Sequence, residues 1–146
     1  MDSAVSVIER VYKSDELPER LAMLINIAGR QRMFIQKMVL HLCLYRSTQR
    51  SESRQELFRT MNRFSVSLNI LKSVTPVAVP DEKREPLVLA LSAAQHNWDA
   101  LRAYMSTATR TTQDQSSKDM LDVDRRAEDL LTEINEIVLL YERAAG

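Results

Sequence analysis

Residues that interrupt regular structure are scarce in this chain, which has two glycines and four prolines among 146 residues. Barrels, β-sandwiches and doubly wound α/β folds need many tight turns, and glycine and proline supply most of them. Leucine, alanine, methionine, glutamate, arginine and glutamine are abundant, and all of them favour helix. The sequence therefore predicts an all-α fold.

Apolar residues recur at helical spacing in four segments, which span about residues 17–45, 55–74, 86–105 and 116–141. Four such segments joined by shorter connections predict an antiparallel up-down four-helix bundle with a long first helix. We expect residues 16–146 to form one domain, preceded by an N-terminal extension over residues 1–15.

The ends of these helices are predicted from prolines and capping residues. Ser14 and Asp15, followed by Pro18, predict the start of the first long helix, and Pro86 suits the first turn of the third. Ser116 with Asp119 resembles a capping box at the start of the fourth.

Three segments are candidate connections. Residues 75–80 are predicted to be the one long loop, because Pro76 and Pro80 lack a backbone donor and restrict the residues before them. Residues 46–51 are polar and fit either a turn or a continuing exposed helix. Residues 109–117 are predicted to be a polar linker.

Several kinds of chemistry lack the residues they need. The net charge is zero, whereas non-specific nucleic-acid binders carry a basic excess. A di-iron bundle needs Glu-x-x-His on two helices, but Met38 and Ala93 stand three residues before His41 and His96. Cys43, the single cysteine, is predicted to be a buried structural thiol. We therefore expect no catalytic residue, no metal and no cofactor, and a hydrolase built on Cys43 is the least favoured alternative.

No run of about 18 apolar residues suggests a membrane span, and the first residues do not resemble a signal peptide. These features predict a cytoplasmic protein if the chain is complete. The alternative is a periplasmic domain cut from an inner-membrane receptor.

The first long helix carries more apolar residues than one buried face requires. One stripe at alternating steps of four and three contains Leu21, Ile25, Ala28, Arg32, Ile35, Val39 and Leu42. A second stripe contains Leu24, Ile27, Gln31, Phe34, Met38 and Tyr45. We expect one stripe to pack in the bundle and the other to contact the same helix of a second subunit, because two-fold dimers are the commonest oligomers.

Arg32 interrupts the first stripe and must be compensated wherever it lies. In a two-fold dimer it would meet its own copy, and a small planar oxyanion would match two opposed guanidinium groups. The alternative is that Arg32 pairs with an acid of the fourth helix, such as Glu133 or Glu136. No acidic residue occurs between Arg20 and Ser51, whereas the fourth segment is rich in acids.

Gly29 and Asn26 are unusual in the same helix. A glycine inside a helix costs about 1 kcal/mol relative to alanine, so a neighbouring helix or a ligand is expected to approach the backbone there. The Asn26 amide is expected either to bond across the bundle or to orient a ligand.

Residues 25–33, with the sequence Ile-Asn-Ile-Ala-Gly-Arg-Gln-Arg-Met, resemble the signature I-N-x-A-G-x-x-R-M of PilJ-type domains. These are the N-terminal sensor domains of type IV pili methyl-accepting chemotaxis transducers, and they are related to NarX-type nitrate/nitrite sensors. Residues 135–142 are similar to the last helix of that family, so the resemblance runs from about Leu21 to the C-terminus.

The resemblance implies a dimeric four-helix bundle that binds a small anion, such as nitrate or nitrite, between the two first helices. Arg32 matches the key arginine of the family and Gly29 its glycine. Two positions depart from the family pattern, because Ile35 stands where a serine is common and Lys37 where a second arginine is common. Lysine keeps the charge but loses the bidentate geometry of arginine.

We therefore expect an anion-sensing domain of a bacterial signal transduction or chemotaxis system. Its partners would be a second copy bound through the first helix and a histidine kinase or chemotaxis output module. The predicted ligand-binding residues are Arg32, Gly29, Arg30, Asn26, Lys37 and Met33. The alternative is a ligand-free adaptor bundle of the same fold that binds other proteins.

Overall fold

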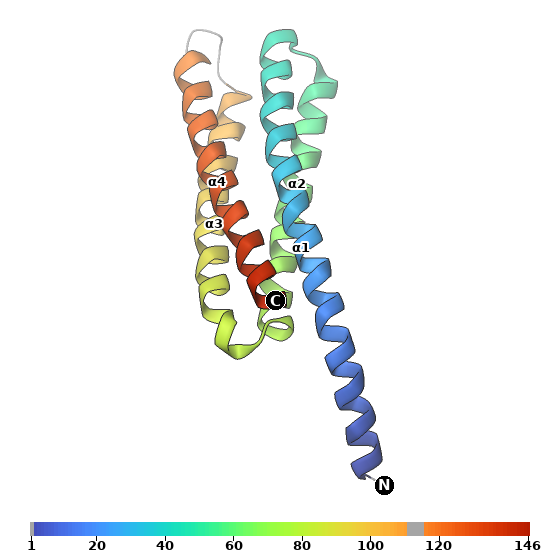
Figure 1. Cartoon of the computed structure of the whole chain (residues 1–146). Helices are drawn as coiled ribbons and strands as arrows, with labels where there is room; N and C mark the ends of the chain where they lie inside the picture. Colours follow the sequence, from blue (N-terminus) through green and yellow to red (C-terminus); the bar gives the residue numbers. More distant parts are fainter. Residues whose placement is uncertain (1, 111–115) are drawn as a thin grey trace.

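The computed structural model describes the backbone of residues 2–110 and 116–146, and the side chains of residues 18–110 and 120–146. Four helices follow one another: α1 (Asp2–Thr48), α2 (Ser51–Ala78), α3 (Asp81–Ala108) and α4 (Ser116–Ala145). Each packs against its neighbours in sequence, and α1 packs against α4. Figure 1 shows the resulting up-down bundle, with the N-terminal part of α1 extending beyond the other helices. The predicted all-α four-helix bundle is confirmed.

The core is continuous from one end of the bundle to the other and contains buried residues from all four helices. Near its middle, the rings of Phe64 and Trp98 lie 4.5 Å apart between centroids, and Trp98 Nε1 donates to Ser65 Oγ at 2.9 Å. The indole thus buries its apolar surface without leaving its N–H unpaired.

The predicted helix starts at Ser14 and Pro86 are wrong. α1 begins at Asp2 and runs through Pro18, and α3 begins at Asp81, five residues before Pro86. One internal proline removes a single backbone hydrogen bond, and a strongly helical context tolerates that loss. At α3, Asp81 and Glu82 occupy the first turn, where negative charge is favourable.

The predicted loop over residues 75–80 is also wrong. α2 continues through Pro76 to Ala78, and only Val79 and Pro80 connect it to α3. Thr75 explains the difference, because it is buried and its hydroxyl lies 2.6 Å from the hydroxyl of Tyr141 on α4. Pro76 lies in the last turn of α2, where its ring disturbs little of the remaining helix.

The connection between α1 and α2 lies within the polar segment expected to be either a turn or a helix. α1 ends at Thr48, and Gln49 adopts a φ of 57° before Arg50 returns to extended backbone. The start of α4 at Ser116 agrees with the sequence. The side chains of the expected capping box, and most of the expected linker over residues 109–117, lie outside the described residues.

The two stripes expected on α1 do not form two separate faces. The buried stripe takes members of both: Leu21, Leu24, Ala28, Gln31, Ile35, Met38 and Leu42. The remaining apolar members, including Ile25, Val39, Ile27 and Phe34, are partly buried on its two flanks. α1 packs against α2 and α4, so these partly buried apolar residues contact helices of the same chain.

Candidate functional site

Arg32 lies on the flank of α1 that faces α4, and it is half-buried. Val39, seven residues later and so on the same flank, lines a groove with residues of α4. The Nε atom of Arg32 is buried and has no hydrogen-bond partner. Within the described residues, no ion pair joins Arg32 to an acid. Among the residues with described side chains, this cation therefore has no acidic partner.

The expected pairing of Arg32 with Glu133 or Glu136 is absent from the described part of the chain. Glu133 instead accepts a hydrogen bond from Asn97 Nδ2 on α3, and its Oε2 atom is buried and unpartnered. Burial raises the pKa of Glu133, an effect that the Asn97 bond partly opposes. Glu133 thus faces α3, whereas Arg32 lies on α1.

Gly29 lies one turn before Arg32 and has no close neighbour within its own chain. A Cβ atom added to Gly29 would meet no heavy atom within 4 Å. The expected approach of another helix of the same bundle is therefore wrong. The described part of the chain thus leaves open space at Gly29.

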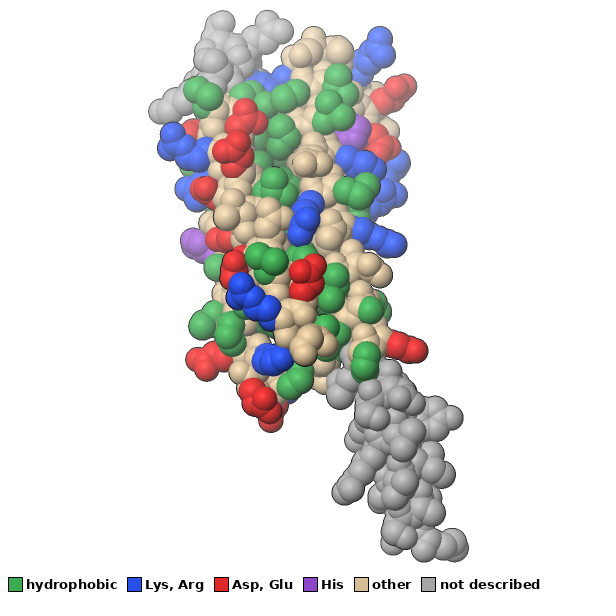
Figure 2. Space-filling model, viewed as in Figure 1, with side chains coloured by type: hydrophobic (Ala, Val, Ile, Leu, Met, Phe, Trp, Pro, Cys, Tyr) green, Lys and Arg blue, Asp and Glu red, His purple; other side chains and the backbone are tan. Residues whose placement is uncertain are grey.

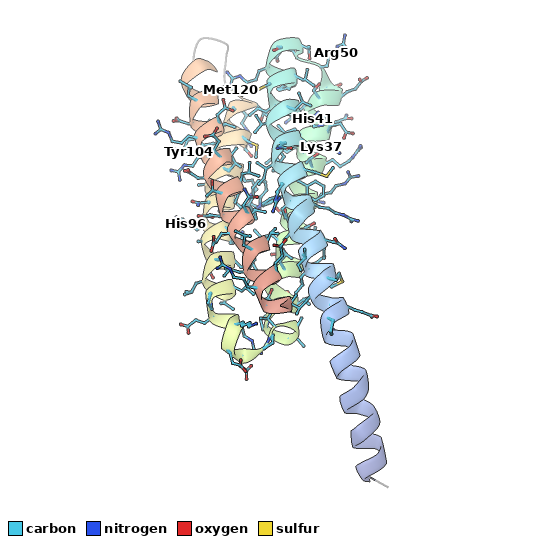
Figure 3. The ribbon with its side chains drawn as sticks, in the orientation of Figure 1. Lys37, His41, Arg50, His96, Tyr104 and Met120 are labelled. Carbon is cyan, nitrogen blue, oxygen red and sulfur yellow. The ribbon has the colours of Figure 1, made fainter. Side chains whose placement is uncertain are left out.

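The other predicted ligand-binding residues point in different directions from Arg32. Asn26 and Met33 lie on the outward face of α1, where Met33 is 54% exposed. Arg30 and Lys37 are exposed on the side toward α2, and Figure 3 shows Lys37 on the side of α1 away from α4. In one copy, therefore, Arg32 and Gly29 share a flank that Arg30 and Lys37 do not share.

Cys43 is exposed, so the expected buried thiol is wrong. It follows the buried Leu42 on the side of α1 next to α4, where partial burial and, to a smaller extent, the charge of Asp124 raise its pKa. Gln31, by contrast with Cys43, is fully buried. Neither its amide nitrogen nor its amide oxygen has a hydrogen-bond partner among the described residues. Its place in the alternating core stripe could have revealed this burial from the sequence.

Charge is divided unequally between the two halves of the bundle. Residues 18–78, in α1 and α2, contain ten Lys and Arg but three Asp and Glu. Residues 81–110 and 120–146, in α3 and α4, contain seven Lys and Arg but eleven Asp and Glu. In Figure 2, basic side chains gather along the edge formed by α1 and α2. An anion therefore meets a favourable potential on the α1–α2 side.

A groove of about 330 Å³ lies between α1 and α4. Its lining is mostly apolar and includes two carboxylates of α4, Asp124 and Glu128. The lining residues are Ile35, Gln36, Val39, Asp124, Ala127, Glu128 and Leu131. From the sequence, neither Asp124 nor Glu128 was predicted to line a groove. Asp124 is seven residues before Leu131, and Glu128 is seven residues after Leu121. This spacing places the four residues on one side of α4.

The described residues lack two further features. They contain no group of three or more His, Cys, Asp and Glu side chains arranged to hold a metal ion. They also contain no helix with the length and hydropathy required to cross a membrane.

Comparison with protein families places the chain in one of them. The model of the type IV pili methyl-accepting chemotaxis transducer N-terminal domain, PilJ, matches residues 18–123. This range contains the motif at residues 25–33, all of α2 and α3, and the beginning of α4. Comparisons with curated proteins and with solved structures gave no match. Because the family match covers well over half of the chain, the protein belongs to the PilJ family of chemotaxis-transducer sensor domains.

Proposed function

We propose that this domain senses a small planar oxyanion, such as nitrate or nitrite, held between Arg32 residues of two copies that contact each other through α1. The observation that carries the proposal is the buried, unpartnered Nε atom of Arg32. A guanidinium keeps its proton, so it gains most from a ligand that supplies charge and paired acceptors together.

Gly29 supports contact through the same flank of α1. A mid-helix glycine costs about 1 kcal/mol relative to alanine. No atom of the described residues occupies the space that its missing side chain leaves open. A second α1 packed against this position would use that space, and it would bring two Arg32 side chains toward one axis.

Electrostatics supplies the coupling between the anion and the dimer. Two guanidinium groups about 6 Å apart repel by roughly 3 kcal/mol at an effective dielectric constant near 20. α1 has no acid from Arg20 to its end to relieve this repulsion. An anion between the two groups replaces repulsion by two charge-assisted contacts, so binding favours one placement of the two α1 helices. The size of that shift equals the difference in anion affinity between the two placements.

This coupling fits a sensor rather than an enzyme. The ligand is bound and released unchanged, and its effect is carried by the relative position of two long helices. In a chemotaxis transducer, this displacement would reach a kinase or methyl-accepting module through the helix ends. Arg30 and Lys37 would strengthen the positive potential around the site without contacting the anion held by Arg32 of the same chain.

Calorimetric titration of nitrate and then nitrite in low-chloride buffer tests the proposal. We expect one anion per two chains for the wild-type protein and no binding for Arg32→Ala. Arg30→Ala is the matched control, since it removes a nearby arginine that faces away from the site. We expect this control to keep the stoichiometry and to bind more weakly.

Anion binding that survives in Arg32→Ala would contradict the proposal, as would a folded wild-type dimer that binds neither anion. The second result would favour the adaptor alternative. A melting-temperature series gives an independent check, because an anion at 100 times its Kd stabilises the native state by about 2.7 kcal/mol.

A further inference from the structure

The groove between α1 and α4 has a definite polarity. Its apolar lining comes from both helices, whereas its two carboxylates, Asp124 and Glu128, come from α4 alone. Both acidic residues are exposed, and no ion pair within the described residues neutralises them. The groove thus offers an apolar surface beside two uncompensated negative charges.

The outward face of α1 carries the complementary pattern. Met33 and Leu40 are each 54% exposed, and they lie seven residues apart on one line along the helix. Lys37 lies between them in the sequence, beside this line on its α2 side, and is also exposed. We call Met33, Lys37 and Leu40 the α1 strip; it presents two apolar side chains and one cation between them.

The two surfaces lie at the same level along the helix axis. Ile35, Gln36 and Val39 of α1 are level with residues 124–131 of α4, because they line the same groove. A two-fold axis parallel to the helices keeps each residue at the height of its copy. The α1 strip of a second copy, at residues 33–40, therefore lies opposite the groove at residues 124–131.

We propose that the α1–α4 groove of each copy receives the α1 strip of the other, with Lys37 placed against Asp124 and Glu128 of the partner subunit. The inference rests on the proposed function, because it specifies how the α1-mediated dimer is held. With the Gly29 flank of α1 turned toward the axis, the outward face carrying Met33 and Leu40 turns toward α4 of the partner subunit. The contact is then made twice, once in each direction.

Charge complementarity identifies a second copy as the occupant. A dimer made by two α1 helices alone would bring cation against cation, since α1 has no acid from Arg20 to its end. Including α4, which has seven acids against three bases over residues 120–146, supplies the missing negative charge. Lys37 then stabilises the dimer by pairing with acids of α4 in the partner subunit, and Arg32 remains available to bind the anion.

Reciprocal charge reversal tests this contact. Lys37→Glu and Glu128→Lys each place like charges together in both contacts of a homodimer. We expect each variant alone to dimerise at least roughly tenfold more weakly than the wild-type protein. An equimolar mixture restores opposite charges in both contacts, because Glu at position 37 meets Lys at position 128 and the native pair forms on the other side. We therefore expect the mixture to dimerise more tightly than either variant alone, although Asp124 still opposes Glu at position 37 in one of the two contacts.

Sedimentation velocity over a concentration series measures these equilibria, and circular dichroism confirms that each variant is folded. Lys72→Glu is the matched control, because it reverses an exposed lysine whose side chain bonds Gln95 on α3, away from α1. We expect this control to dimerise like the wild-type protein.

Three results would overturn the docking proposal: single variants that dimerise like the wild-type protein, a mixture that stays as monomeric as its components, or a wild-type protein that remains monomeric with nitrate present. Anion titration separates this failure from failure of the proposed function. Arg32-dependent nitrate binding in a dimer insensitive to charge reversal would leave sensing intact and refute the docking. Charge-dependent dimers that bind no anion would support the docking and refute sensing.

Discussion

Replacing Gly29 by alanine should strengthen the fold of the single chain. Helix propensity favours alanine over glycine by about 0.8–1.0 kcal/mol in a helix interior. The new Cβ atom meets no heavy atom within 4 Å, so no steric penalty offsets that gain. For a chain of this size, about 1 kcal/mol corresponds to a rise in melting temperature of roughly 2–4 °C. The measurement belongs at protein concentrations below the dimer Kd.

The same substitution should weaken association. If the backbone of a second α1 approaches at Gly29, an added methyl group forces the two helices apart and moves both Arg32 side chains. Overpacking a close contact typically costs about 1–3 kcal/mol, which corresponds to roughly a 5- to 150-fold weaker dimer. Sedimentation and nitrate calorimetry should therefore show weaker dimerisation and weaker anion binding in a more stable chain.

Ser92→Ala on α3 is the control, because Ser92 is exposed on a helix that lies across the bundle from α1. It should raise the melting temperature slightly and leave dimerisation and anion binding unchanged. A Gly29→Ala protein with wild-type dimerisation and wild-type anion affinity would refute the placement of a partner helix at this position. A destabilised Gly29→Ala monomer would refute the open space itself.

Two further substitutions test buried polar groups. Thr75 donates to the carbonyl of Leu71, so the hydroxyl of Tyr141 donates to Thr75, and Tyr141→Phe should cost about 1 kcal/mol in urea unfolding. Burial raises the pKa of Tyr141 from 10.0 to about 12, so wild-type stability should fall as pH rises above 10, and less so in the variant. Glu133→Gln keeps an acceptor for Asn97 and removes a carboxylate whose pKa burial raises above 4.5. The melting temperature of this variant should rise relative to that of the wild-type protein as pH increases above 4.5, and this difference should disappear in acid.

The number and order of the helices could be predicted from the sequence because periodicity and the scarcity of glycine act locally. Their ends could not, as Pro76 illustrates. A proline pair predicts a break when only neighbouring residues are considered. The helix continues because Thr75 bonds Tyr141, 66 residues away, and no local pattern contains that contact.

The candidate site was predicted in part. The motif at residues 25–33 drew attention to Arg32 and Gly29, which share a flank of α1. Which residues of α1 are buried depends on where α2 and α4 lie, and the sequence does not contain this information. The pattern placed Gln31 in one of two stripes without showing which of them the core would take, and it did not distinguish Met33 and Leu40 as an exposed strip.

The division of charge links the two proposals. An α1 helix rich in arginine and lysine is ill-suited to meet its own copy, yet Gly29 has open space that only an outside group can fill. Two sources of negative charge resolve this conflict: the acids of the partner's α4, which are permanent, and an anion at Arg32, which comes and goes. In the proposed dimer, the permanent source would set a basal affinity between the copies, and the exchangeable source would adjust the spacing of the two α1 helices. Removing the α4 acids should therefore make dimerisation depend strongly on anion concentration, whereas removing Arg32 should make it independent of the anion.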